Sequence, residues 1–194
     1  MATSTRRRQR GQSIVEIALA APVLIALLLG AFDSAVLVSD KVIAGGACRQ
    51  GARLGAELGG TITNTQSPPM TVQEADNYIV RNMLAVAKAM NYSTITDIYI
   101  YAPQEVDGNL PLTGAGAPTG PDYVDRFSIS GSPGAYTATI VGAYNLTLDR
   151  RLQVPPQETP IAVKIRWTYA PPTGLGLNIV LTEYATFMAA PVLP

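Results

Sequence analysis

The sequence contains no histidine and only one cysteine, Cys48, among its 194 residues. A disulfide within the chain is therefore impossible, and a zinc site made of cysteine and histidine is excluded. Catalysis that uses an imidazole as its base is excluded as well. Cys48 can still pair with a second chain in an oxidising compartment, or it can be a small buried residue on a helix.

Charge is also scarce, since charged residues make up 14% of the chain and hydrophobic residues 47%. This balance is apolar for a soluble protein. The formal net charge is zero, but the four arginines before Gly11 (Arg6, Arg7, Arg8 and Arg10) have no acidic neighbour in that segment. The rest of the chain is therefore net acidic, and binding of nucleic acid by a basic surface is not expected.

A long apolar run follows the arginines. No side chain from Ile17 to Phe32 is charged or forms hydrogen bonds, and the apolar character extends from Ile14 to Val38. A helix of roughly 20 residues crosses the hydrocarbon core of a bilayer, and a basic cluster stays on the cytoplasmic side. The sequence therefore predicts a single-pass protein of the cytoplasmic (inner) membrane, with its N-terminus in the cytoplasm and the part after about residue 38 outside.

Glu16 interrupts this apolar run. One explanation is a carboxylate that snorkels to the headgroups from one turn inside the membrane. Another is that the run is a cleaved secretory signal with its small-residue site at Ala18–Ala20, although that cut would leave an apolar core of only a few residues. The snorkelling carboxylate alone does not account for Gly11 or the arginines.

The segment around Gly11 resembles the processing signal of type IV prepilins. A short charged leader (residues 1–11) ends in Gly11, and Gln12-Ser13-Ile14-Val15-Glu16 begins the apolar helix, so that glutamate is the fifth residue after the glycine. The resemblance implies that prepilin peptidase cuts between Gly11 and Gln12 and leaves the helix in the membrane.

Cleavage would also give Glu16 a partner. The new N-terminus at Gln12 has a charged amine, and a buried carboxylate needs an opposite charge or hydrogen bonds. When apolar helices bundle, the Glu16 carboxylate of one subunit can meet the Gln12 amine of its neighbour. This pair would fix the axial register of assembly.

Helical character continues beyond the membrane segment. Small residues recur at helical spacing (Gly45, Cys48, Ala52, Gly55, Gly59), and Arg49, Arg53 and Glu57 fall on the other side. Gly51, Gly55 and Gly59 repeat every fourth residue and allow close packing of the helix. We expect one helix over residues 12–60, roughly 72 Å long and kinked by Pro22; a break at Gly45-Gly46 is the alternative.

The N-terminal motif resembles the TadE-like family, which comprises minor pilins, or pseudopilins, of tight adherence (Flp) pilus systems. Gly11-Gln12-Ser13-Ile14-Val15-Glu16-Ile17-Ala18-Leu19 followed by Pro22 forms the resemblance, and Ala47–Arg53 is similar to the family's continuation. The family commonly has phenylalanine where this chain has Ile17. The resemblance implies an assembly subunit whose partners are prepilin peptidase, other pilin subunits, the inner-membrane assembly platform and membrane lipid.

The sequence after residue 60 predicts a linker (residues 61–70) and an α+β head (residues 71–194). Thr71 and Glu74 have the spacing of a capping box, and a second helix should bury Val72, Ala75, Ile79, Met83, Val86 and Met90. Strands are expected over Thr96–Tyr101, Tyr123–Ser130, within Tyr136–Leu148, and over Ile161–Tyr169 and Asn178–Met188, the last two as an antiparallel hairpin. In the fourth expected strand, Ile161–Tyr169, large apolar residues alternate with Lys164, Arg166 and Thr168. This pattern predicts a sheet with one face exposed to water.

No pattern in the head predicts an active site, a cofactor or a metal. Ala102–Pro121 is rich in glycine and proline and is expected to be an exposed loop. Asp122 and Asp125 are too few ligands for calcium, which takes six to eight oxygens. Two other hypotheses remain: a signal-anchored membrane protein with a ligand-binding head, and an enzyme that uses carboxylates.

Overall fold

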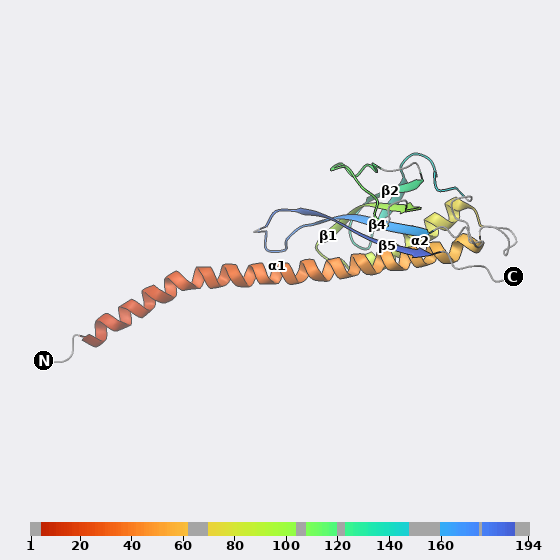
Figure 1. Cartoon of the computed structure of the whole chain (residues 1–194). Coiled ribbons are helices and arrows are strands. Elements are labelled where there is room, and N and C mark those ends of the chain that lie inside the picture. The colour runs from red at the N-terminus through yellow and green to blue at the C-terminus, as the bar shows by residue number, and fades with distance from the viewer. Residues whose placement is uncertain are drawn as a thin grey trace.

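A computed structural model describes residues 5–61, 70–103, 108–119, 123–147, 160–174 and 176–188. In the first helix, side chains are described from Ser13 to Leu58. The elements are α1 (Thr5–Thr61), α2 (Val72–Ala87), β1 (Ser93–Tyr101), β2 (Val124–Ser130), β3 (Thr137–Ile140), β4 (Pro160–Tyr169) and β5 (Ile179–Met188). Figure 1 shows α1 as a long stem with the other elements, here called the head, packed along its C-terminal half. The predicted α+β fold is confirmed.

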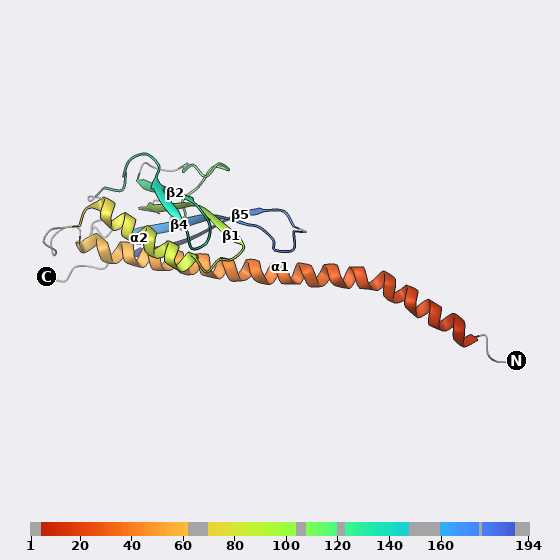
Figure 2. The same ribbon diagram turned by 180° about the vertical axis from the view of Figure 1, so that it is seen from behind.

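The helix α1 is continuous through Gly45 and Gly46, so the alternative of a break there is wrong. Its backbone begins at Thr5 and thus includes Gly11 and the arginines before it. Figures 1 and 2 show a bend in the red part of the helix, the part of the chain that contains Pro22. Proline removes an intrahelical hydrogen bond and clashes with the preceding turn, which explains the bend.

The C-terminal half of α1 has the two expected faces. Its small residues are buried against the head, namely Ala44, Ala47, Cys48, Ala52 and Ala56. Arg49, Arg53 and Glu57 are exposed, and Arg53 Nε donates to Glu57 Oε1 at 2.7 Å. Small side chains let the head approach the helix backbone, so the packing compensates for the poor helix propensity of glycine in this stretch.

The helix α2 lies beside the C-terminal half of α1 (Figure 2). The capping box forms as predicted: Glu74 N donates to Thr71 Oγ1 at 3.2 Å, and Thr71 N donates to Glu74 Oε2 at 2.8 Å. The hydrogen bond from the Thr71 backbone lowers the pKa of Glu74. Most of the predicted apolar face is buried, but Val86 is 38% exposed, and Val80 and Ala87 are buried instead. The buried stripe has turned away from Val86 by the last turn.

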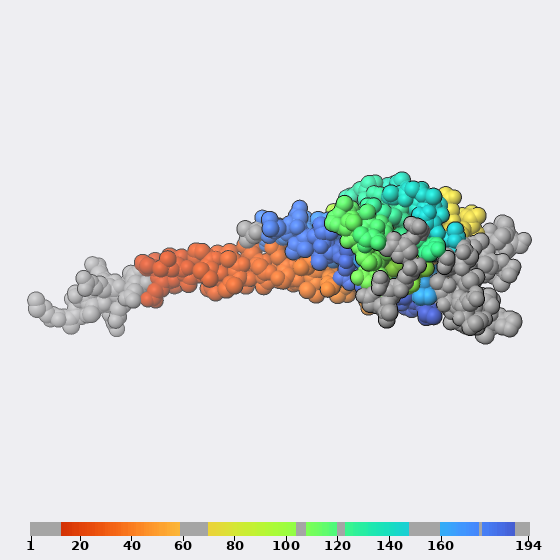
Figure 3. Space-filling model, turned by 45° about the horizontal axis from the view of Figure 1, so that its top comes forward, coloured from red at the N-terminus to blue at the C-terminus, as the bar shows by residue number. Residues whose placement is uncertain are grey.

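The five strands form one antiparallel sheet in the order β3-β2-β1-β4-β5. The β4–β5 pair is the predicted hairpin, with Tyr169 opposite Ile179 and Pro160 opposite Met188. One face of the sheet packs on α1 and α2, and the core there includes Trp167, Phe127 and Ile98, all almost fully buried. Figure 3 shows the head covering the stem at this end while the red part of the helix projects beyond it.

The prediction of a wet second face on β4 is wrong. Lys164 is only 5% exposed, and its Nζ donates to Asn109 Oδ1 at 2.8 Å and to the Leu110 carbonyl at 2.6 Å. The expectation that Ala102–Pro121 is an exposed loop is only partly met. Pro111, Thr113, Gly114, Ala115 and Thr119 are exposed, but residues 108–119 fold over the sheet and bury Leu110. Alternation of apolar and polar residues along a strand indicates that one face is polar. It does not show whether a segment distant in sequence covers that face.

Two glycines of α1 provide a matched test of this packing. A Cβ at Gly55 would lie 2.9 Å from Ile161 Cγ2, whereas a Cβ at Gly46 would meet nothing within 4 Å. Gly46→Ala should therefore raise the free energy of unfolding by about 1 kcal/mol through helix propensity. Gly55→Ala should lower it by about 1 kcal/mol, because overpacking against a stiff β-branched side chain outweighs the same gain.

The measurement is denaturant unfolding of the full chain in detergent micelles, followed by the fluorescence of Trp167, the only tryptophan. Stabilisation by both substitutions would contradict the close packing of Gly55.

Candidate assembly interface

The N-terminal half of α1 is a bare apolar helix. Its large side chains are between 52% and 72% exposed on every side of the helix, namely Ile14, Val15, Ile17, Leu19, Val23, Leu24, Ile25, Leu27, Leu28 and Phe32. By length and composition α1 is a candidate membrane span between Ser13 and Leu58, and its most apolar window is not covered by the rest of the chain. A helix that is apolar all round needs lipid or other helices around it.

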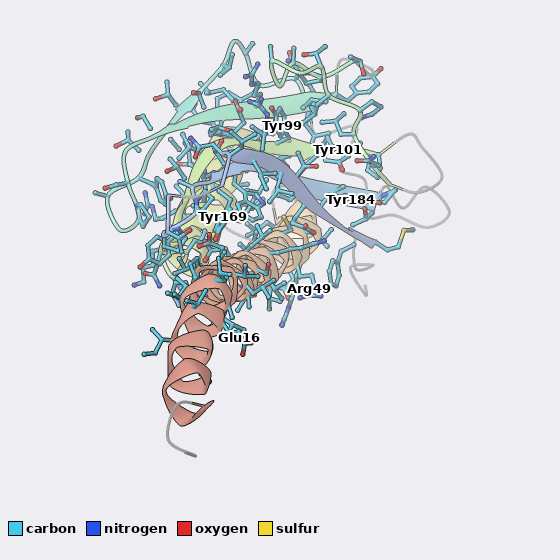
Figure 4. The ribbon with its side chains drawn as sticks, turned by 90° about the vertical axis from the view of Figure 1, so that its left-hand side faces the viewer. Glu16, Arg49, Tyr99, Tyr101, Tyr169 and Tyr184 are labelled. Atoms are coloured by element: carbon cyan, nitrogen blue, oxygen red, sulfur yellow. The ribbon has the colours of Figure 1, made fainter. Side chains whose placement is uncertain are left out.

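The predicted processing residues lie at the start of this helix. Gly11 and Gln12 belong to the α1 backbone, but the surroundings of their side chains and of Arg6–Arg10 lie outside the described residues. The side chain of Glu16 is exposed, and Figure 4 shows it projecting from the helix away from the head. The carboxylate is thus placed on the surface that a neighbouring helix or lipid would cover.

The predicted packing glycines occupy a different place. Gly51 and Gly55 are buried against the head of their own chain, where their nearest neighbours are Met83 and Ile161. The surroundings of Gly59 lie outside the described residues. The apolar surface of α1 that the head leaves uncovered is therefore its N-terminal half.

The head begins to hold α1 at Asp33. The hydroxyl of Tyr169 donates to the Asp33 carbonyl at 2.8 Å, and the Thr173 hydroxyl donates to the Asp33 carboxylate. Tyr169 ends β4 and Thr173 lies in the turn that follows it. The β4–β5 hairpin therefore contacts α1 at the edge of the head that is nearest to the N-terminal half of the helix. The sequence interpretation missed this contact, although an acid at the end of an apolar helix is a signal that a partner is needed.

Three further contacts hold the helix to the head. Buried Asp40 accepts from Ser93 Oγ at 2.5 Å, and Lys41 Nζ lies 3.7 Å from Glu183 Oε1. The fully buried Cys48 thiol donates to the Glu183 carbonyl at 3.2 Å. Cys48 is therefore the buried helix residue, and pairing with a second chain would require the head to open.

Charged groups on the far face of the sheet form an internal network. Asp97, 4% exposed, accepts from Arg126 Nη2 at 2.8 Å and from Arg166 Nη1 at 3.3 Å. Tyr99 lies in the same layer and donates to the Gly116 carbonyl at 2.5 Å; burial, together with the Asp97 carboxylate, raises its pKa to about 12. The hydrogen bond from Tyr99 to Gly116 holds residues 108–119 on the sheet. The Asp97 carboxylate is already paired with two arginines.

A shallow hollow lies beside this network, lined by Asn109, Leu112, Lys164, Arg166, Val180 and Thr182. In the described part of the chain, no group of three His, Cys, Asp or Glu side chains could hold a metal ion. Asp125 is buried and accepts from the backbone N–H groups of Asn145 and Leu146, and its suggested calcium partner Asp122 lies outside the described residues. The strand tyrosines labelled in Figure 4 do not form an exposed platform, because Tyr99, Tyr101 and Tyr169 are buried and only Tyr184 is exposed.

Comparison with known proteins gives one match. The sequence model described as TadE-like protein matches residues 11–53. Searches of curated proteins and of solved structures give no match. The matched segment starts at Gly11 and extends through the bare helix into the part that packs under the head. Over residues 11–53 this chain is therefore similar to the TadE-like family, in agreement with the resemblance predicted from the sequence.

Proposed function

We propose that this protein is a minor pilin, or pseudopilin, of a tight adherence (Flp-type) pilus. It is inserted in the cytoplasmic membrane with its head outside, is cut by prepilin peptidase between Gly11 and Gln12, and enters the fibre through the bare part of α1. Its function is structural, in assembly and adhesion, and it is not an enzyme.

The observation that supports this proposal is the division of α1 into two parts. One face of the C-terminal part is buried by the head, whereas most side chains of residues 13–32 are apolar and exposed, and Glu16 lies among them. A simple anchor has no use for a carboxylate in that position. An assembly helix has one, because the Glu16 carboxylate can pair with the Gln12 amine of the next subunit and fix the axial register.

Identification of the N-terminal residue of the protein recovered from its host tests the proposal. Gln12 at the N-terminus supports it. A chain that still begins at Met1 or Ala2 where prepilin peptidase is active contradicts it and favours a signal-anchored protein with a ligand-binding head.

A further inference from the structure

The tip of the β4–β5 hairpin is the most exposed apolar feature of the head. Leu177 is 87% exposed, and Ile179 and Val180 at the start of β5 are 43% and 53% exposed. No residue from Trp167 to Thr182 is charged. One exposed leucine is ordinary, but several large apolar side chains exposed together at an uncharged tip are typical of a surface that contacts protein or membrane.

The position of the hairpin tip relative to α1 limits which kind of partner can cover the exposed side chains of the tip. Figures 1 and 2 both show the hairpin extending along α1 toward the N-terminal end of the helix. Thr173, within the turn, is hydrogen-bonded to the Asp33 side chain through its backbone N–H at 3.4 Å and through its hydroxyl. The tip is thus fixed at the level of Asp33, where the bare apolar helix ends.

The length of the bare helix then sets the depth of the tip in the membrane. Residues 13–32 form about 30 Å of α-helix, which equals the thickness of the hydrocarbon core, about 30 Å. If this segment spans the core, Asp33 lies at the outer boundary between hydrocarbon and headgroups. The hairpin tip, held at Asp33, lies at the same boundary.

The neighbours of the tip suit such a boundary. The Ala170 N–H donates to the Tyr92 carbonyl at 2.9 Å, so Tyr92, which is 44% exposed, stands next to the base of the hairpin. Tyr169 is buried in the head and only fixes the position of the hairpin through its hydroxyl, so Tyr92 is the tyrosine that can face the boundary. Tyrosines are enriched where an apolar ring meets hydrocarbon and its hydroxyl meets headgroups.

We infer that the β4–β5 hairpin is a second membrane contact, in which Leu177 enters the headgroup region of the outer leaflet and seats the head on the bilayer before assembly. This inference rests on the proposed membrane insertion of α1. The occupant is lipid, because the exposed tip is uncharged and apolar and is held at the level where the bare apolar part of the helix ends. Extraction into a fibre would then have to withdraw the hairpin as well as the helix.

The test uses the full chain with Cys48→Ala, reconstituted at low protein density in vesicles of phosphatidylethanolamine and phosphatidylglycerol. An environment-sensitive fluorophore is attached at one of three single cysteines: Leu24→Cys, Leu177→Cys or Met188→Cys. Met188 is the matched control, since it is 58% exposed at the other end of β5, about 30 Å from Ile179 along the strand. All three side chains are exposed, so the substitutions leave the core unchanged.

We expect the label at residue 177 to emit further to the blue than the label at residue 188. Its emission should fall roughly twofold with a lipid quencher placed at headgroup depth, the depth of an interfacial contact. The label at residue 24 should respond to quenchers deep in the acyl chains, and that at residue 188 only to a water-soluble quencher.

If residue 24 is in lipid but residue 177 behaves like residue 188, the inference is wrong and the membrane insertion stands. A blue-shifted label at residue 177 that ignores lipid quenchers would indicate contact with protein and would also overturn the inference. If residue 24 is not in lipid, the proposed insertion fails, and the inference fails with it.

Discussion

Glu16→Ala should leave membrane insertion intact and remove the protein from the fibre. Insertion depends on the apolar residues around Glu16, and losing a charge within them favours lipid. Assembly should fail because the amine of Gln12 on the neighbouring subunit would be buried without its counter-charge. Breaking a buried ion pair costs about 3 kcal/mol or more, which corresponds to roughly a 100-fold weaker association.

The measurement compares the amount of protein in the membrane fraction with that in sheared surface fibres. Glu57→Ala is the matched control, since Glu57 is a second exposed glutamate of the same helix and pairs with Arg53 outside the apolar segment. It should assemble normally. Glu16→Gln keeps the shape of the side chain and should fail like Glu16→Ala; normal assembly of Glu16→Gln would show that the charge does not set the register.

Asp97→Ala should destabilise the head by about 3 kcal/mol, because it leaves two arginines, Arg126 and Arg166, side by side and without their shared carboxylate. The side chains of these arginines are 25% and 17% exposed, so water can relieve only part of the cost. The change should also loosen residues 108–119, since Arg166 Nη2 donates to the Gly114 carbonyl at 2.8 Å.

Denaturant unfolding of the full chain in micelles, followed through Trp167, measures this effect. Glu57→Ala again serves as control, because it breaks an exposed ion pair whose N–O distance is also short, 2.7 Å. Exposed pairs contribute about 0–1 kcal/mol, so this variant should unfold almost as the unchanged protein does. If both variants lose the same free energy of unfolding, burial does not make the Asp97 ion pairs more stabilising than the exposed pair.

Much of the architecture could be predicted from the sequence because it depends on local patterns. The apolar run, the spacing of small residues after Gly45 and the alternation in Ile161–Tyr169 fix a long helix and a hairpin. The Thr71–Glu74 spacing also fixed the start of α2, since a capping box depends only on residues within one turn.

The failures of prediction concern contacts between segments far apart in the chain. Lys164 was expected in water, and it is buried because residues 108–119 return over the sheet and offer it Asn109 Oδ1 and the Leu110 carbonyl. Asp33 and Asp40 were not assigned partners, because Thr173 and Ser93 are distant in sequence. A polar residue in an apolar stretch shows that a partner is needed, but not which one.

In the candidate assembly site, too, local patterns could be interpreted from the sequence, whereas contacts between distant segments could not. The assignment of Gly11, Gln12 and Glu16 rests on local spacing and stays a prediction, to which the structure adds that Glu16 lies on the surface that the head leaves bare. The packing glycines could not be assigned a partner in advance. Gly51 and Gly55 face Met83 and Ile161 of the same chain, so in the proposed fibre the segment before Asp33 is the part of α1 left for bundling.

If one cut converts a membrane anchor into an assembly helix, the mass of the protein will show it. The full chain should be expressed with and without the prepilin peptidase of its host and analysed by intact mass and N-terminal peptide mapping. We expect the peptidase to remove residues 1–11 and the product to begin at Gln12 and stay in the membrane. An unchanged N-terminus at Met1 or Ala2 with active peptidase present would contradict it.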